Sequence, residues 1–348
     1  MGRVLTVVHC GLGPIGQGIA RMLLQTEGVR IVGVSDVSAS KAGKDLGEIL
    51  GLPKKVRLKI DPNGERFAKR AKADIAVVCT TSSAKGIKPL IATLVSRRIN
   101  VITTCEELAF PTPATQAIFK DLDKLAKSKK VSILATGVNP GFVMDALAAM
   151  MTAPCVKVER IAVARVVDAG TRRLSLQRKV GAGLNAHQFR RALTEGHVQH
   201  VGLSQSAHML AAALGWKLDK VEETIDAAIA PRDLDTDNLR IPAGATAGIK
   251  QHARGYRNGQ VVVSLDLQMY VGAESPRDHI LIEGIPKIDM TVAGGIAGDV
   301  ATAAIVINSL PKLLAAPAGL LTMLDLPLVH ALNPGELKER LAKGTKKR

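Results

Sequence analysis

Short runs of apolar, mostly β-branched residues alternate with amphipathic stretches over the first 138 residues of the chain. The apolar runs have the length of strands and are Val4–Val8, Arg30–Val34, Asp74–Cys79, Asn100–Thr103 and Val131–Leu134. Between them, apolar residues recur at spacings of three and four, which predicts helices over Gly16–Gln25, Ile87–Arg97, Thr115–Lys127 and, less regularly, Lys41–Leu50. Strands that alternate with helices predict an α/β fold, a doubly wound parallel sheet with helices on both faces.

The pattern changes after the turn signal Asn139-Pro140-Gly141. Longer runs with partial alternation predict strands over Val158–Asp168, Val261–Val271, His279–Glu283 and Lys287–Val292. Helical spacing predicts helices over Met144–Met151, Asn185–Glu195, Ser204–Ala213 and Leu218–Ala227. This second region is therefore of the α+β type, and its half-polar strands indicate a sheet face that is solvated or packed on another subunit.

The length of 348 residues favours two domains, and the patterns place them at residues 1–138 and 139–298. A long apolar helix is expected over Val300–Ala315, with Asp299 as its cap and Pro311 near its last turn. We expect this helix, residues 299–316, to return and pack on the first domain. Residues 317–348 then form a C-terminal segment that ends in a basic tail, Lys343 to Arg348.

A glycine-rich loop joins the first strand to the first helix. Its sequence is Gly11-Leu12-Gly13-Pro14-Ile15-Gly16, and Asp36 follows the second strand 20 residues after the last glycine. In a dinucleotide-binding Rossmann domain the first glycine allows a tight turn, the second allows a pyrophosphate to approach, and the third allows the helix to pack on the strand. The helix N-terminus then meets the anion, and the acid meets the adenosine ribose. The alternative is a glycine-rich turn that binds nothing.

The residues after the second strand bear on the choice between NAD and NADP. Asp36 favours NAD, because a carboxylate repels a ribose 2′-phosphate. Ser38, Ser40 and Lys41 favour NADP, because hydroxyls and an ammonium group can hold that phosphate. We expect NADP to be accepted, with NAD as the other option.

Two further segments follow predicted strands and are candidates for cofactor contacts. Thr80 and Thr81 lie at the carboxyl end of the strand that ends at Cys79, where an open parallel sheet binds its ligands. Asn139 lies at the end of the last strand of the first domain, where its amide suits the nicotinamide carboxamide or a substrate nitrogen. The alternatives are a helix cap for the threonines and a turn residue before proline for Asn139.

Two adjacent acids, Glu106 and Glu107, follow the strand Asn100–Thr103 and are flanked by apolar residues. A carboxylate that is partly desolvated beside a cofactor has a raised pKa and transfers protons near neutral pH. The alternative is a helix N-terminus decorated with acids, which is a common pattern.

Lysine and arginine outnumber aspartate and glutamate by 47 to 31, which gives a net charge of +16. Such a charge suits anionic partners, namely nucleic acid, a membrane surface or a phosphorylated cofactor. Aromatic residues are only 2% of the chain, so few rings are available to stack on bases, and we expect no nucleic-acid partner. A pocket in this chain must be lined mainly by aliphatic side chains, which favours small aliphatic substrates.

The four cysteines are Cys10, Cys79, Cys105 and Cys155, and their spacing matches neither a disulfide framework nor a metal site. We therefore expect no metal and a reducing, cytoplasmic location. The apolar stretch Leu313–Leu332 is interrupted by prolines, a glycine and an aspartate, so we expect no membrane span.

Several segments of this chain resemble one family of oxidoreductases. The chain is similar to 2,4-diaminopentanoate dehydrogenases and the related native NAD(P)H-dependent amine dehydrogenases, whose N-terminal domain is like that of dihydrodipicolinate reductase. Beside the glycine loop, the segments that carry the resemblance are Thr104–Leu108, Gly137–Phe142, Arg172–Gln177, Lys179–Gly183, His200–Leu203, Gly298–Thr302 and Pro317–Met323. They span almost the whole chain.

The resemblance implies reductive amination of a carbonyl compound with ammonia and the reverse deamination of an amine, with the second domain binding substrate and forming a homodimer. It also implies that a glutamate of Thr-Cys-Glu-Glu is catalytic; we assign this role to Glu106, with Glu107 as second choice. A carboxylate suits the chemistry, since ammonium must lose a proton and the departing hydroxyl must gain one. The rivals are 2,4-diaminopentanoate dehydrogenase itself, another reductase of C=N or C=O bonds, a binding protein that senses dinucleotides, and a nucleic-acid binder.

Overall fold

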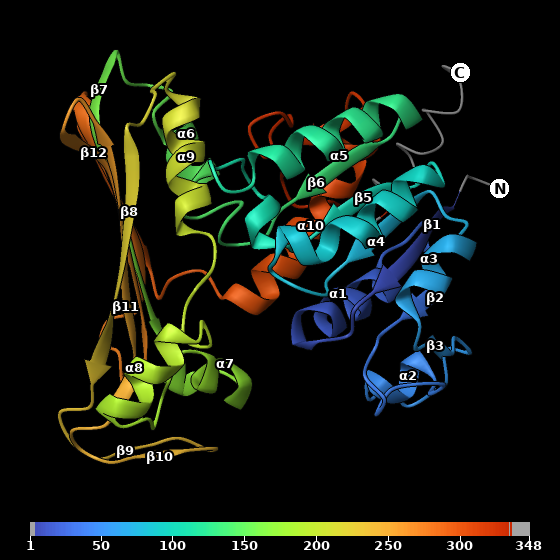
Figure 1. The fold of residues 1–348 in the computed structure, drawn as a ribbon, viewed down its shortest axis with the longest axis horizontal. Helices are drawn as coiled ribbons and strands as arrows, with labels where there is room; N and C mark the ends of the chain where they lie inside the picture. Colours follow the sequence, from blue (N-terminus) through green and yellow to red (C-terminus); the bar gives the residue numbers. More distant parts are fainter. Residues whose placement is uncertain (1–3, 334, 336–348) are drawn as a thin grey trace. The chain divides into compact units, whose positions relative to one another are not determined.

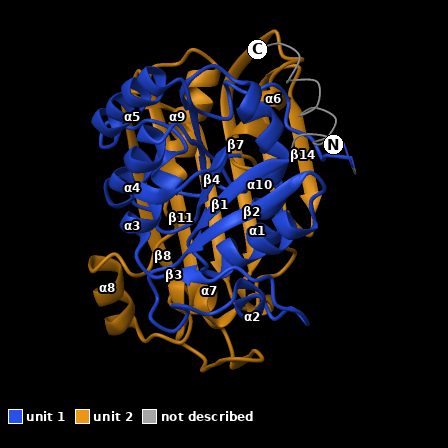
Figure 2. Ribbon diagram, turned by 90° about the vertical axis from the view of Figure 1, so that its right-hand side faces the viewer, with its two compact units in different colours: residues 1–141, 297–348 blue, residues 142–296 orange. Residues whose placement is uncertain are grey.

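The computed structural model describes residues 4–333 and 335 (Figure 1). These residues form two units (Figure 2). Unit 1 comprises the described residues of 1–141 and 297–348, and unit 2 comprises Phe142–Ile296. Unit 1 therefore extends to Gly141 and not only to residue 138, and the chain returns to it at Ala297. The basic tail from Lys343 lies outside the described residues.

Unit 1 is built on a fully parallel sheet of seven strands in the order β15-β6-β5-β4-β1-β2-β3. The strands are β1 (Leu5–Cys10), β2 (Val29–Ser35), β3 (Ile60–Asp61), β4 (Ile75–Val78), β5 (Asn100–Thr103), β6 (Ser132–Ala135) and β15 (Gly319–Leu321). β4 and β6 are buried along their whole length, and β5 along all but its first residue. That burial is why these strands read as continuous apolar runs in the sequence.

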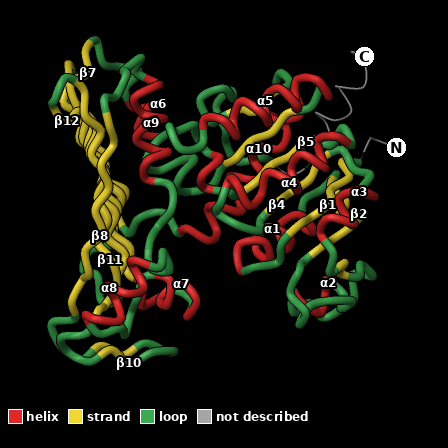
Figure 3. Tube along the Cα trace, in the orientation of Figure 1, coloured by secondary structure: helices red, strands yellow, loops and turns green. Residues whose placement is uncertain are grey.

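Helices cover both faces of this sheet (Figure 3). They are α1 (Pro14–Gln25), α2 (Leu46–Ile49), α3 (Gly64–Arg70), α4 (Ala84–Ser96), α5 (Gln116–Lys129) and α10 (Gly298–Ala315). α1 packs against α10, whereas α4 packs against α3 and α5. The doubly wound fold expected from the sequence is confirmed. β3, α3 and β15 were not expected, because each is short and β15 pairs with β6 across a long stretch of chain.

α10 returns the chain to unit 1 and packs on α1, β5 and β6. Within residues 4–333, it is the one helix whose length and composition would suffice to cross a membrane, and half of it is buried inside the protein. Such burial is typical of a core helix. Asp299 does not cap this helix, since the cap position is Ala297 and Asp299 lies in the first turn. Its carboxylate instead lies near the positive end of the helix dipole.

Unit 2 is built on a six-stranded sheet in the order β14-β13-β7-β12-β11-β8. Its strands are β7 (Lys157–Asp168), β8 (Lys220–Ile229), β11 (Thr246–Arg257), β12 (Gln260–Tyr270), β13 (Arg277–Ile285) and β14 (Ile288–Ala293). β7 and β12 are parallel, and the other neighbours are antiparallel. Between β8 and β11 in the sequence, β9 (Leu234–Asp235) and β10 (Arg240–Ile241) form a separate small antiparallel hairpin.

The helices of unit 2 are α6 (Ala146–Met151), α7 (Leu174–Lys179), α8 (Ala186–Thr194) and α9 (Leu203–Ala213). α9 packs on β8, β11 and β12 and also contacts α6, and Figure 1 shows both helices on one face of the sheet. The residues of β7 that share this face, such as Ile161 and Val163, are fully buried, while Ala162 and Ala164 on the other face are half-buried.

The helix predicted over Leu218–Ala227 is wrong, because this segment is strand β8. Leu218, Val221 and Ile225 recur at helical spacings of three and four, but Val221 and Ile225 also fit an alternation of period two. β8 pairs with β11 from Lys220 to Ile229, and this long ladder decides the conformation. β11 itself was missed, since its polar residues hide the alternation.

Candidate functional site

The glycine loop lies where three backbone segments of unit 1 come very close together. A Cβ atom on Gly11 would lie 2.3 Å from the carbonyl oxygen of Cys79, and Gly11 has a φ of +93°. A Cβ atom on Gly16 would lie 2.1 Å from the carbonyl oxygen of Gly11. Real Cβ atoms do not approach so closely, so both positions require glycine. The first and third glycines of the motif therefore do what the sequence pattern predicts.

The start of α1 faces the loop without a side-chain cap. Gly13 occupies the cap position, Pro14 is the first helical residue and Ile15 follows it, half-buried. A Cβ atom on Gly13 would meet nothing within 4 Å. This open space beside uncapped N–H groups and the positive end of the helix dipole is suited to an anion such as a pyrophosphate.

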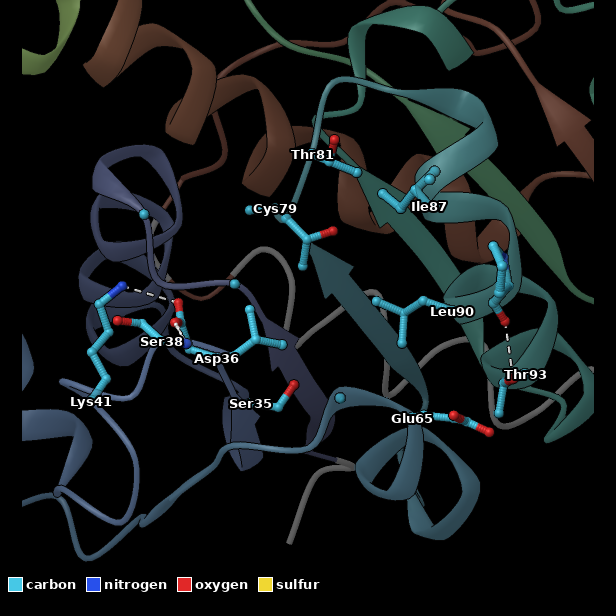
Figure 4. Close-up of a pocket in the computed structure, with 17 residues that line it drawn as sticks. Ser35, Asp36, Ser38, Lys41, Glu65, Cys79, Thr81, Ile87, Leu90 and Thr93 are labelled. Atoms are coloured by element: carbon cyan, nitrogen blue, oxygen red, sulfur yellow. Dashed lines mark hydrogen bonds and ion pairs between the residues drawn. The ribbon is translucent and has the colours of Figure 1, made fainter.

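A cavity of about 650 Å³ opens beside the loop (Figure 4). Of the predicted cofactor residues, Gly11, Gly13, Asp36, Ser38, Lys41, Thr80 and Thr81 line it. Pro14, Ile15, Gly16 and Asn139 do not, and neither do the two glutamates. Its remaining lining residues are Ser35, Val37, Gly64, Glu65, Cys79, Gly86, Ile87, Pro89, Leu90 and Thr93.

The sequence did not indicate the far wall of this cavity. Ile87, Leu90 and Thr93 lie on α4, and Glu65 lies on α3. Ile87 belongs to the apolar pattern of α4, which by itself indicates only burial in the core. The usable signal was the position of α4 directly after the carboxyl end of β4, where a parallel sheet binds its ligands. An apolar wall opposite the glycine loop is suited to a flat heteroaromatic base, so the cavity fits a dinucleotide.

Asp36, directly after β2, is held by three donors. Its Oδ1 accepts a bond from the Ser38 N–H at 2.9 Å, and its Oδ2 accepts bonds from the Leu12 N–H at 2.6 Å and from Lys41 Nζ at 3.1 Å. Burial alone would raise the pKa of Asp36, but these hydrogen bonds outweigh it and hold the pKa below the usual value. The carboxylate is therefore ionised at neutral pH, and it holds the glycine loop in place through its hydrogen bond with the Leu12 N–H.

His9 is a residue that the sequence reasoning missed. Its side chain is fully buried near the end of β1, next to the backbone of Gly11 and Gly16. Burial lowers its pKa to about 4. A Cβ atom on Gly16 would lie 3.3 Å from its Nε2, so a neutral ring fills the space beneath the loop.

The two glutamates after β5 lie in a short 3-10 turn, Glu106–Leu108. Glu107 Oε2 accepts a bond at 2.8 Å from the N–H of Ala84, the first residue of α4. Burial raises the pKa of Cys79 to about 12, and the nearby charge of Glu106 adds to that shift. Glu106 is half-buried in the turn after β5. The Thr104 N–H, two residues before it, donates to the Val78 carbonyl at 3.2 Å, next to the cavity-lining Cys79, whereas the Glu107 side chain lies at the N-terminus of α4.

The loop after β6 lies beside the turn that carries these glutamates. The Thr136 N–H donates to the Thr103 carbonyl at 2.9 Å, which extends the pairing of β5 with β6. Asn139 is 8% exposed, and both polar atoms of its amide are without a partner among the described residues. Buried amides are nearly always hydrogen-bonded, so this one is suited to a polar group of a ligand.

No group of three or more histidine, cysteine, aspartate and glutamate residues in the described ranges is arranged to hold a metal ion. The four cysteines are free thiols.

Comparisons with known proteins agree with this picture. The family model of the 2,4-diaminopentanoate dehydrogenase C-terminal domain matches residues 142–342. Over 98% of both chains, the sequence is 31% identical to a 2,4-diaminopentanoate dehydrogenase of Acetoanaerobium sticklandii.

Two solved structures show the same fold. An amine dehydrogenase from Mycobacterium smegmatis matches with a TM-score of 0.84 and 21% identity over 95% of this chain and 98% of the other. A biliverdin reductase from Synechocystis sp. PCC 6803, solved with biliverdin and NADP+, matches with a TM-score of 0.55 and 12% identity over 97% and 99%.

Gly16→Ala tests the glycine loop. The added methyl group would overlap the Gly11 carbonyl, so the loop must shift, and we expect dinucleotide affinity to fall at least about tenfold. Gly18→Ala is the matched control in the same helix, because its Cβ would meet nothing within 4 Å. Fluorescence titration with a reduced dinucleotide measures both, and equal affinities in the two variants would contradict the assignment.

Proposed function

The chain belongs to the 2,4-diaminopentanoate dehydrogenase family, and on that premise we propose that it is an NAD(P)H-dependent amine dehydrogenase for small aliphatic ketones and aldehydes. In the amination direction, a carbonyl compound, ammonia, NAD(P)H and a proton give an amine, NAD(P)+ and water. In the reverse direction the amine is deaminated oxidatively. The observation that carries the proposal is the half-buried Glu106 in the turn after β5, where the Thr104 N–H bonds to the end of β4, next to Cys79 and Thr80, which line a dinucleotide-sized cavity.

Glu106 is the proposed proton-transfer group. Its carboxylate takes a proton from ammonium, so that ammonia attacks the carbonyl carbon, and returns a proton to the hydroxyl that leaves as water. It also stabilises the cationic iminium by its charge. The bound dinucleotide supplies the hydride that this iminium carbon receives. Glu107, whose Oε2 accepts the bond from the Ala84 N–H, is the second choice for this role.

Asn139 is proposed to bind either the carboxamide of the nicotinamide or the substrate nitrogen. Its buried amide, which has no partner among residues 4–333, offers one acceptor and two donor hydrogens, which match both groups. Thr80 and Thr81 line the cavity at the carboxyl end of β4, and we assign them to the ribose on the nicotinamide side. NADP is proposed as a cofactor beside NAD, with Ser38 and Lys41 near the adenosine ribose.

A second candidate is the activity of the relative itself, a 2,4-diaminopentanoate dehydrogenase. The 31% identity over 98% of both chains favours it. Both candidates use the same proton transfer and the same cavity, and they differ in whether the substrate is a diamino acid or a simple amine. The scarcity of aromatic residues supports an aliphatic substrate in either case.

The proposed assembly is a homodimer formed through the sheet face of unit 2 that lies opposite α9. Polar side chains cross-link this face: Asp266 bonds His252 and Arg254, and His279 bonds Asp289. The small Ala164 lies between Asp266 and His279 in the sheet, and Ala162 lies between Ser264 and Leu281. Two-fold dimers are the commonest assembly among soluble homo-oligomers. The free thiols support a reducing, cytoplasmic location.

Ammonia-dependent oxidation of NADPH and NADH tests the function. With a panel of small ketones, aldehydes and 2-amino-4-keto acids, we expect turnover that requires ammonia and is faster with aliphatic than with aromatic carbonyls. The keto-acid arm separates the diamino acid candidate from the simple amine candidate. If no carbonyl compound of the panel gives ammonia-dependent turnover, the proposal is wrong.

Glu106→Gln tests the proton-transfer role. Because general acid–base catalysis contributes about 10²–10⁴-fold, we expect kcat for amination to fall at least about 100-fold while dinucleotide affinity stays within about threefold. Glu107→Gln is the companion variant. It weakens the hydrogen bond to the Ala84 N–H at the start of α4, so it should lower the melting temperature while kcat stays close to that of the wild type. Loss of kcat in the Glu107 variant alone would move the role to that residue.

Ala162→Arg tests the assembly. A long charged side chain at the centre of the open face should prevent two copies from meeting there, so sedimentation equilibrium should change from a dimer to a monomer. Val156→Arg is the control, because Val156 is 90% exposed and lies before the first residue of β7. A monomeric wild-type protein would refute the proposed dimer.

A further inference from the structure

The hydrogen bonds that Asp36 already accepts leave its carboxylate few positions at which to accept bonds from a cofactor. We infer that Lys41, and not Asp36, determines how strongly the protein prefers one of the two dinucleotides, and that its side chain makes the site accept the ribose 2′-phosphate. This inference rests on the proposed dinucleotide function and assigns a specificity-determining residue within it.

The hydrogen bonds of Asp36 can be counted against its capacity. An ionised carboxylate has about four lone-pair positions on its two oxygens. Leu12 N–H and Lys41 Nζ occupy Oδ2, and the Ser38 N–H occupies one position on Oδ1. One position remains on Oδ1, so the carboxylate cannot accept bonds from both hydroxyls of a ribose through separate oxygens. The usual advantage of NAD at such an acid is reduced.

The ammonium group of Lys41, in contrast to the Asp36 carboxylate, keeps a hydrogen-bonding position for a ligand. It has three hydrogens, and it donates to the Leu12 carbonyl at 2.9 Å and to Asp36 Oδ2 at 3.1 Å. One hydrogen is left, and Lys41 lines the cavity with its side chain 20% exposed. Figure 4 shows Lys41 and Ser38 on the same side of Asp36. A phosphate on the ribose would therefore find one ammonium hydrogen. Beside it lies the Ser38 hydroxyl, 2.9 Å from the Ser40 hydroxyl, which can donate to a phosphate while it accepts from Ser40.

Charge acts in the same direction as the hydrogen-bond count. Among the described residues that line the cavity, Lys41 is the one cation, and Asp36 and Glu65 are the anions. Glu65 is paired with Lys69 at 2.7 Å, and Asp36 is paired with Lys41. Removing the charge of Lys41 would take away the attraction for a phosphate and also leave Asp36 unbalanced, so that it repels the phosphate. Both changes act more strongly against NADPH, which carries the additional ribose phosphate, than against NADH.

Lys41→Met tests this inference by direct binding of NADPH and NADH without substrate. We expect the affinity for NADPH to fall roughly 10- to 100-fold, as for the loss of a charge-assisted hydrogen bond, while the affinity for NADH changes less than about threefold. Lys44→Met is the matched control, because Lys44 lies three residues away, pairs with Glu48 and does not line the cavity. It should leave both affinities unchanged.

Lys41→Arg should restore most of the NADPH affinity, since a guanidinium keeps the charge and binds phosphate well. An equal loss for NADPH and NADH in the Met variant would show a merely structural role and overturn the inference, as would no loss for NADPH. Failure of the wild-type protein to bind either dinucleotide would instead refute the proposed function. The titration thus distinguishes the two failures.

Discussion

The site depends on the close backbone contact between the glycine loop and its neighbours. β1, the N-terminus of α1 and the end of β4 meet without any side chain between them, because Gly11 lies against Cys79 and Gly16 against Gly11. Any side chain there would separate the helix from the sheet. The contact also determines where the negative charge of Asp36 lies, since the Leu12 N–H, which follows Gly11, donates a hydrogen bond to the Asp36 carboxylate.

The chemistry follows from the parallel register of the strands next to this contact. β4, β5 and β6 end at neighbouring positions, so the segments that follow them share one edge of the sheet. One segment carries Thr80, the next Glu106 and the third Asn139. The sheet thus brings a cavity wall, a carboxylate and a buried amide to one edge, although none of them is close to another in sequence.

Much of this was predictable, because the informative residues follow strands that read as plain apolar runs. The glycine spacing, Asp36 and the glutamates were all found by position alone. What failed depended on contacts that no local pattern carries. The segment Leu218–Ala227 fits helix and strand alike until β11 pairs with it. Ile87 and Leu90 are ordinary helix residues until α4 is placed on the sheet, and the pairing of Asp36 with Lys41 appears only when the loop closes.

The order in which the chain completes its two units follows from the position of α10 and β15. Unit 2 is one continuous stretch, Phe142–Ile296, and it is complete before residue 297 has been synthesised. Unit 1 begins first but lacks the helix that covers α1 and the strand that pairs with β6 until the last part of the chain emerges. Domains generally fold as units during synthesis. During synthesis, unit 1 therefore lacks the helix that packs on α1, β5 and β6 and the strand that pairs with β6 until after all of unit 2 has been made.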